Sequence, residues 1–155
     1  MSLRDRIQAD LKDAMRNKDQ LRLATLRLIQ AAVKDRDIAA RAEDRCDGCD
    51  QGEIMALLQK LVKQREESAD TYEQAGRLDL AERERTEAAI VREYLPEPMD
   101  DKAIADAARD VVDELDAAGL KDMGKCMGAL KQRYTGRMDF SQAGKEVKTL
   151  LQTRA

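Results

Sequence analysis

The sequence contains no histidine and no tryptophan, and aromatic residues make up only 3% of its 155 positions. Without histidine, the chain lacks the side chain that most often transfers protons at neutral pH. It also contains no glycine-rich phosphate loop with its lysine and hydroxyl residue, and no Ser-x-x-Lys or comparable nucleophile motif. An enzyme that acts alone is therefore disfavoured, and we expect no cofactor.

The shortage of aromatic residues also bears on the fold. Strands are enriched in aromatic and β-branched side chains, so a core of Leu, Ile, Val, Met and Ala favours packed helices. Charged residues reach 38% of the chain, against roughly 25% in ordinary globular proteins. Many acids and bases stand four residues apart, where they can pair along one helix face. These features predict an all-α protein.

Long apolar runs are absent as well. No segment approaches the run of about 18 apolar residues that marks a membrane-spanning helix, and the first residues lack the apolar stretch of a secretory signal. The early acids Asp5, Asp10 and Asp13 are unlike an organelle transit peptide. Three cysteines, an odd number, fit reduced thiols better than a disulfide framework. We expect a cytoplasmic protein with no membrane partner.

Only two prolines occur, Pro96 and Pro98, and one glutamate separates them. Proline disfavours helix at the preceding residue and lacks a backbone donor, so this is the best candidate for a domain boundary. We predict an N-terminal domain of about four helices, two of them long, at residues 1–95, and a C-terminal three-helix domain at residues 99–155. Apolar spacing places the helices near 2–17, 18–42, 53–75, 80–95, 101–119, 122–134 and 139–151. The residues predicted to begin helices are Ser2, Asp100 or Asp101, Asp122 and Asp139, and those predicted to end them include Gly76, in a left-handed conformation, Gly119 and Gly136.

The helix predicted at 18–42 has a broad apolar surface that includes Leu21, Leu28 and Val33. Such breadth predicts contact with two neighbouring elements rather than one. The same helix and the next one carry cations that could extend a basic surface, dock a protein or simply be solvated. These cations are Arg22, Arg27, Lys34, Arg36, Lys60, Lys63 and Arg65.

A net charge of −3 conceals strong segregation along the chain. Residues 96–120 contain 2 bases and 8 acids, whereas residues 121–155 contain 8 bases and 3 acids, a local charge of +5. A helix with an apolar side and a cationic side is typical of polyanion binding; the alternative is a solvated surface that complements helix dipoles. The candidate phosphate contacts are Lys121, Lys125, Lys131, Arg133, Arg137, Lys145 and Lys148.

Gly124 and Gly128 stand four residues apart on one side of the helix predicted at 122–134. A glycine inside a helix costs about 1 kcal/mol relative to alanine, so some contact should offset the loss. We favour close packing against another helix of the domain; the alternative is backbone access for a phosphate near the start of the helix.

Cys46 and Cys49 have the spacing of half a zinc site. A structural zinc site needs four ligands, and the chain offers no histidine and only Cys126 as a further thiol. A site completed by carboxylates or by a second chain, and a reversible redox pair, stay open as alternatives. We expect free thiols in an exposed loop and no metal.

Several segments resemble one known family. These are TLRLIQAAVKDRDIAAR, LQKLVKQREESADTYEQAGRLDLAERE, the EYLPEPM junction and KDMGKCMGALKQRYTGRMD, which occur in family order over nearly the whole chain. Together they resemble the YqeY-like proteins, a small bacterial family. Their C-terminal part is similar to the tail domain of the B subunit of glutamine-dependent aminoacyl-tRNA amidotransferase. The Cys46–Cys49 loop and residues 137–140 depart from the family pattern.

The resemblance implies a connection to tRNA, because tail domains of this kind hold tRNA while other subunits carry out glutamine hydrolysis and amide transfer. It implies no chemistry, so a carbon–nitrogen ligase label with glutamine as amide donor would be inherited by association. We therefore expect an accessory protein that binds tRNA or another structured RNA. The alternative is an adaptor that docks onto an amidotransferase or another enzyme without contacting RNA.

Overall fold

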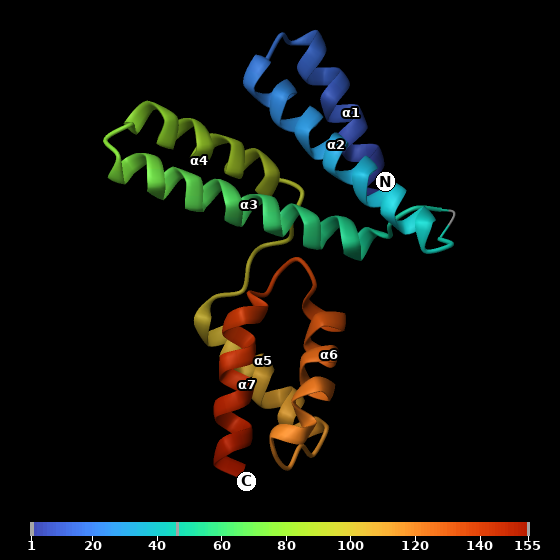
Figure 1. The fold of residues 1–155 in the computed structure, drawn as a ribbon, viewed down its shortest axis with the longest axis vertical. Helices are drawn as coiled ribbons and strands as arrows, with labels where there is room; N and C mark the ends of the chain where they lie inside the picture. The colour runs from blue at the N-terminus through green and yellow to red at the C-terminus, as the bar shows by residue number, and fades with distance from the viewer. Residues whose placement is uncertain (1, 46, 155) are drawn as a thin grey trace. The chain divides into compact units, whose positions relative to one another are not determined.

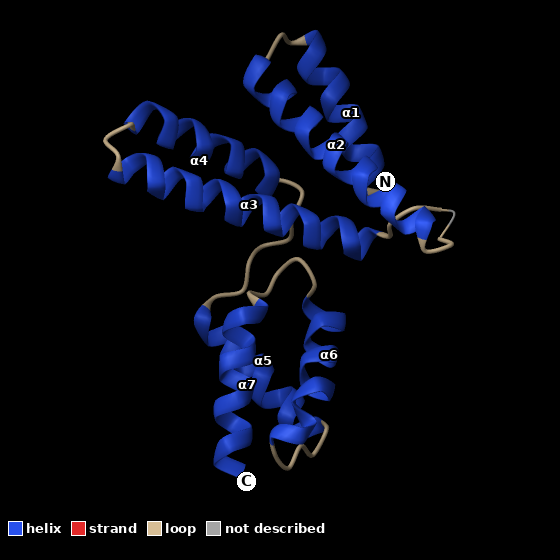
Figure 2. Ribbon diagram, in the orientation of Figure 1, coloured by secondary structure: helices blue, strands red, loops and turns tan. Residues whose placement is uncertain are grey.

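The computed structural model describes residues 2–45 and 47–154, and it confirms the prediction of an all-α fold. The described residues form seven α-helices and one short 3₁₀ helix, η1, with no strand (Figure 2). The chain divides into two compact units, Met1–Pro96 and Glu97–Ala155. The elements are α1 (Leu3–Arg16), α2 (Gln20–Ala42), α3 (Gln51–Gln74), α4 (Leu78–Arg92), α5 (Asp101–Glu114), η1 (Leu120–Asp122), α6 (Met123–Tyr134) and α7 (Phe140–Arg154).

Most helices begin at a residue that satisfies the free N–H groups of the first turn. In five of them a serine hydroxyl or an aspartate carboxylate accepts a hydrogen bond from a backbone N–H two or three residues later. The turn between α3 and α4 uses Gly76 in the left-handed conformation (φ 76°), as predicted. The five capping residues are Ser2, Asp19, Asp50, Asp100 and Asp139.

The connection between α5 and α6 differs from the prediction. Helix α5 ends at Glu114, because Asp116 takes a left-handed conformation (φ 49°); Gly119 is extended and does not cap the helix. The Asp122 carboxylate does not cap α6 either. It accepts a hydrogen bond from the backbone N–H of Ala118, at 2.9 Å. The short η1 turn therefore leads directly into α6.

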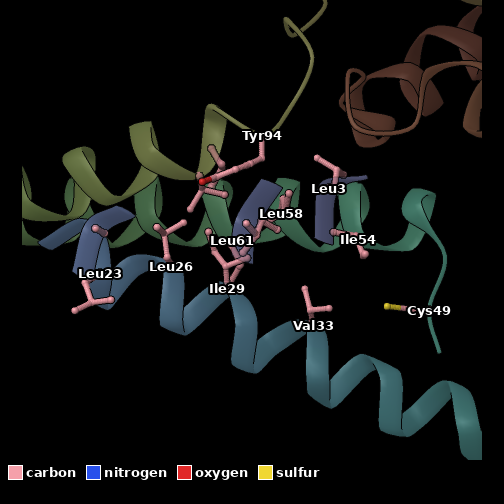
Figure 3. Packing of buried hydrophobic residues seen from close by; sticks show 14 residues of the cluster. Leu3, Leu23, Leu26, Ile29, Val33, Cys49, Ile54, Leu58, Leu61 and Tyr94 are labelled. Carbon is pink, nitrogen blue, oxygen red and sulfur yellow. The ribbon is translucent and has the colours of Figure 1, made fainter. Parts of the chain in front are cut away.

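The N-terminal unit consists of two helical hairpins, α1–α2 and α3–α4 (Figure 1). Its core lies where the inner side of α2 packs against the other three helices. Figure 3 shows Leu26 and Ile29 of α2 close to Leu58 and Leu61 of α3. The apolar surface predicted for this helix is only partly covered, because Leu28 points away from that core and is 41% exposed.

The EYLP motif at the end of α4 has a structural role. The Tyr94 hydroxyl donates a hydrogen bond to the Asp10 carboxylate at 2.5 Å, and burial raises the pKa of that hydroxyl. The guanidinium of Arg6 lies over the Tyr94 ring, 5.2 Å from its centre. Arg22 of α2 donates to the Glu93 carboxylate at 2.6 Å. These contacts fasten the end of α4 to α1 and α2.

The C-terminal unit is a bundle of α5, α6 and α7. Apolar residues from all three helices are buried in one cluster, together with Met138 from the connection between α6 and α7. The preceding residue, Arg137, accepts a backbone hydrogen bond from Met99 at 2.9 Å, so the start of this unit is tied to that connection. No helix in the described residues is long and apolar enough to cross a bilayer.

Candidate nucleic-acid interface

Helix α6 separates apolar and cationic residues. Cys126 and Leu130 are fully buried against α5 and α7, while the other side of the helix is exposed. Successive residues on a helix turn by about 100°, so the positions two before Cys126 and Leu130 lie far from the core. That exposed side carries Gly124, Lys125, Gly128 and Lys131.

The prediction that Gly124 and Gly128 pack closely against another helix of the domain is wrong. A Cβ atom added at either position would meet no heavy atom within 4 Å. The inward residues of α6 are Cys126 and Leu130, which place both glycines on the open side. No intrachain contact among the described residues therefore offsets the cost of these glycines.

The contact between α6 and α7 places Lys148 of α7 beside this surface. A Cβ atom at Gly144 of α7 would lie 3.9 Å from the methyl groups of both Met123 and Met127. Lys148 follows Gly144 by four residues and Lys131 follows Met127 by four, so each stands on the side of its helix that borders the same seam. We use the name α6–α7 basic face for the exposed lysines of η1, α6 and α7 together with the two open glycines of α6, namely Lys121, Gly124, Lys125, Gly128, Lys131, Lys145 and Lys148.

One carboxylate lies among these lysines. Asp122 accepts the hydrogen bond from Ala118, and this contact, with smaller effects of Lys125 and Lys121, lowers the pKa of its carboxyl group. The Asp122 carboxylate is therefore held by the preceding loop, and the two lysines affect it only through their charge. None of the five lysines of the face forms an ion pair with a described residue.

The two arginines of the predicted set have protein partners. Arg133 donates to the Glu114 carboxylate of α5 at 2.6 Å, and this hydrogen bond raises the pKa of its guanidinium. The Nε of Arg137 donates to the carbonyl oxygen of Glu97 at 3.4 Å. Arg133 thus turns toward α5, whereas the five lysines keep their charges available.

A second polar cluster, not predicted from the sequence, lies at one end of the N-terminal unit. Arg4 of α1 donates to both oxygens of the Asp37 carboxylate on α2, at 2.8 and 2.5 Å, and to the carbonyl oxygen of Cys49 at 2.8 Å. The backbone N–H of Cys49 donates to Asp37 at 2.9 Å. These partners lie 33 and 45 residues from Arg4, and no local spacing pattern links them. The cluster holds the α2–α3 loop against α1.

This cluster corrects the prediction for the cysteine pair. Cys49 is buried rather than exposed, and burial followed by its hydrogen bond to Asp37 raises the pKa of its thiol. A raised pKa keeps the thiol protonated at neutral pH, which suits neither metal binding nor nucleophilic reactivity. Cys46 lies outside the described residues. Within the described ranges, no three His, Cys, Asp or Glu residues are placed to hold a metal ion.

Replacing Gly128 with alanine should stabilise the C-terminal unit by about 1 kcal/mol, because alanine is the better helix former and its methyl group meets open space. The same change at Gly124 should stabilise less, because this glycine lies in the first turn of α6. Urea denaturation would measure both changes. Gly76→Ala is the matched control: it also meets open space, but its positive φ predicts destabilisation. A loss of stability in Gly128→Ala would contradict the geometry.

The fold and the basic face define a small two-unit helical protein whose C-terminal bundle carries exposed lysines on α6 and α7. The chain belongs to the YqeY-like protein family, whose model matches residues 4–151. This membership confirms the resemblance found in the sequence motifs, and it fits a small accessory protein.

The chain is also similar to fungal proteins named "Altered inheritance of mitochondria protein 41, mitochondrial". The protein from Pyrenophora tritici-repentis is 27% identical over 149 residues, which cover 94% of this chain and 79% of that protein. The one from Lachancea thermotolerans is 35% identical over 102 residues, 65% of this chain and 52% of that protein. The one from Clavispora lusitaniae is 35% identical over 89 residues, 57% of this chain and 49% of that protein. The matched segment thus spans about half the length of the last two relatives.

Proposed function

We propose that the α6–α7 basic face binds structured RNA, with tRNA as the first candidate, and that the protein has no catalytic activity of its own. The observation that supports this most directly is the set of five lysines without ion pairs around two exposed glycines. Ammonium groups neutralise phosphates and release their counterions. Exposed glycines give a sugar–phosphate backbone access to the surface of α6.

The face is suited to recognising shape and phosphate groups rather than bases. Base stacking needs exposed aromatic rings, but Tyr134 and Phe140 are partly buried and pack against the core of the unit. Double-stranded RNA is recognised mainly through its shape and its phosphate and 2′-hydroxyl groups. A folded RNA with helical arms therefore fits this surface better than a single strand.

The resemblance to the amidotransferase tail domain supports tRNA as the ligand. We also propose that the chain binds a protein that takes part in tRNA-dependent amidation. We do not propose carbon–nitrogen ligase activity for the chain itself. We propose that the protein acts in a compartment that contains tRNA. One such compartment is the cytoplasm. The other is the mitochondrion, which the names of the fungal relatives give for those proteins.

Titration with total tRNA at two ionic strengths tests the proposal. With three to five phosphate contacts, the logarithm of the binding constant should fall with the logarithm of salt concentration with a slope of about −2 to −4.5, at roughly −0.7 to −0.9 per contact. A slope near zero, or no binding at low salt, would refute RNA binding by this face. Protein partners that resist RNase treatment and co-purify without RNA would support the adaptor alternative.

Gly128→Ala adds a second test, because it should stabilise the unit and yet weaken tRNA binding several-fold if a phosphate chain contacts α6 at this position. Unchanged affinity would restrict the contact to the lysine side chains.

A further inference from the structure

The outer side of α2 carries an apolar stripe that no helix of the N-terminal unit covers. Leu28 and Ile38 are among the most exposed large apolar residues described, at 41% and 63%. The core of the unit lies on the opposite side of α2, on Leu26, Ile29 and neighbouring residues (Figure 3). We use the name α2 outer stripe for the exposed residues Ala24, Leu28, Ala31, Asp35, Ile38 and Ala42.

The spacing within the α2 outer stripe is typical of a helix that packs against another helix. Its members are separated alternately by four and three residues, the interval of the apolar positions in a coiled coil. Small alanines alternate with Leu28 and Ile38, which would leave room for the side chains of a facing helix. The stripe is also narrow, as expected for contact with one helix rather than with a flat surface.

Unpaired cations follow one edge of the stripe. Arg27, Lys34 and Arg41 recur every seven residues, all are exposed, and none forms an ion pair with a described residue. By contrast, Arg22 and Arg36 of the same helix are paired with Glu93 and Glu53. The stripe itself contains one carboxylate, Asp35, near its middle. The charges that α2 presents are therefore three cations along an edge and one central anion.

A second copy of the chain does not match these charges. An antiparallel pair of α2 helices would place Leu28 against Ile38 and Ala24 against Ala42, which suits their sizes. The same register places Arg27 near Arg41, and Lys34 near its own copy. Like charges at facing edge positions disfavour the pairing.

An anionic membrane or a nucleic acid fits no better. Either polyanion would meet Asp35 in the centre of the contact. Helices that lie on membranes insert a large apolar face of Trp, Phe or Leu, whereas the stripe has only two large apolar residues, Leu28 and Ile38. Single-stranded nucleic acids stack on aromatic rings, and the stripe contains none. A helix with acids opposite the three cations and one base opposite Asp35 satisfies every charge.

We infer that the α2 outer stripe docks an amphipathic helix of another protein, with apolar residues at alternating intervals of four and three. Glu or Asp at its edge faces Arg27, Lys34 and Arg41, and one Lys or Arg faces Asp35. This site lies in the N-terminal unit, and it does not depend on RNA binding by the α6–α7 basic face.

A designed helical peptide tests the inference with the full-length protein. The acidic probe has three heptads with leucine at the apolar positions, glutamate along the edge and one lysine at the central apolar position. The control probe exchanges glutamate and lysine. Fluorescence anisotropy should show saturable binding of the acidic probe, with at least tenfold weaker binding of the control. Equal binding of both probes, or no binding of the acidic one, would overturn the inference.

Two sets of variants locate the site. The double variant Leu28→Gln and Ile38→Gln should weaken binding of the acidic probe at least tenfold, and circular dichroism should show unchanged helix content, because both side chains are exposed. The triple variant Arg27→Glu, Lys34→Glu and Arg41→Glu should make the protein prefer the control probe. Unchanged binding in either set would refute the site.

The other occupants give distinct results. Sedimentation of the free protein should show a monomer. A dimer that is lost in the Leu28→Gln and Ile38→Gln variant would assign the stripe to a second copy. The triple variant should lower tRNA affinity by less than about fivefold, the loss expected from its change in net charge alone, and the protein should not bind anionic vesicles. A larger loss of tRNA affinity in the triple variant would assign the stripe to RNA. Vesicle binding that depends on Leu28 and Ile38 would assign it to an anionic membrane.

Discussion

Replacing Asp37 with asparagine is expected to lower the free energy of unfolding of the N-terminal unit by about 2–3 kcal/mol. Asparagine keeps the shape of the side chain but removes the charge that both Arg4 nitrogens contact. Charged hydrogen bonds of this kind contribute about 1.5–3 kcal/mol, and removal of one partner of a buried pair costs more. The expected loss stays within the range for charged hydrogen bonds, because the Arg4 side chain is 39% exposed to solvent and the pair is therefore only partly buried. Urea denaturation followed by circular dichroism would measure the change.

The difference between wild type and Asp37→Asn should also depend on pH. The Arg4 guanidinium lowers the pKa of the Asp37 carboxyl group far below its ordinary value, and the backbone N–H of Cys49 adds to this. A lowered pKa in the folded protein gives stability that is fully present above the pKa of the unfolded chain, about 3.9. This stability is lost as the pH falls toward the folded-state value. The free energies of unfolding of the two proteins should therefore differ most above about pH 5, and the difference should shrink progressively as the pH falls below about 4.

Asp35→Asn is the matched control for this prediction, because Asp35 lies on the same helix but is exposed and forms no ion pair with a described residue. Its stability should stay within about 0.5 kcal/mol of wild type. Equal losses in both variants, or a difference between wild type and Asp37→Asn that is constant with pH, would show that the Arg4–Asp37 pair does not stabilise the unit.

Replacing Lys125 and Lys131 together with glutamate is expected to lower tRNA affinity at least tenfold at about 0.1 M salt. Both residues are exposed on α6 beside the two glycines, so the change removes two attractive charges and adds two repulsive ones. The slope of the logarithm of the binding constant against the logarithm of salt concentration should also become less steep, by the equivalent of about two phosphate contacts. Filter binding or anisotropy at several salt concentrations would measure both effects, with circular dichroism as the check on helix content.

Lys60→Glu with Lys63→Glu changes the net charge by the same amount, but both residues lie on α3 in the other unit. If the basic face binds tRNA, this control should lose less than about threefold. Equal losses in the two double variants would mean that tRNA responds to the net charge of the chain, and the assignment of the α6–α7 basic face would fail.

Local features of the fold could be predicted because their signals are local. Ser2 and Asp139 cap their helices, and Gly76 takes the left-handed conformation, because each role depends on residues within a few positions along the chain. The two prolines are a local signal of the same kind; the compact units of the structure are Met1–Pro96 and Glu97–Ala155.

The remaining features depend on residues that are distant in sequence. Asp37 looked like one charge among many on α2, and only folding brings Arg4 and Cys49 to it. The spacing of Gly124 and Gly128 showed that they share a side of the helix, but not whether that side faces the core or solvent. Arg133 likewise belongs to the basic segment, and its pairing with Glu114 required the position of α5.

The separation of charge within the C-terminal unit affects how fast a polyanion can bind. Residues 100–116, which comprise α5 and the residues next to it, carry seven of the eleven acids of this unit, whereas its lysines other than Lys102 lie on η1, α6 and α7. Such a charge distribution gives the unit a permanent dipole, which rotates the basic side toward an approaching anion and repels it from the acidic side. Collisions in the wrong orientation would then separate quickly, so salt should slow association more than it speeds dissociation.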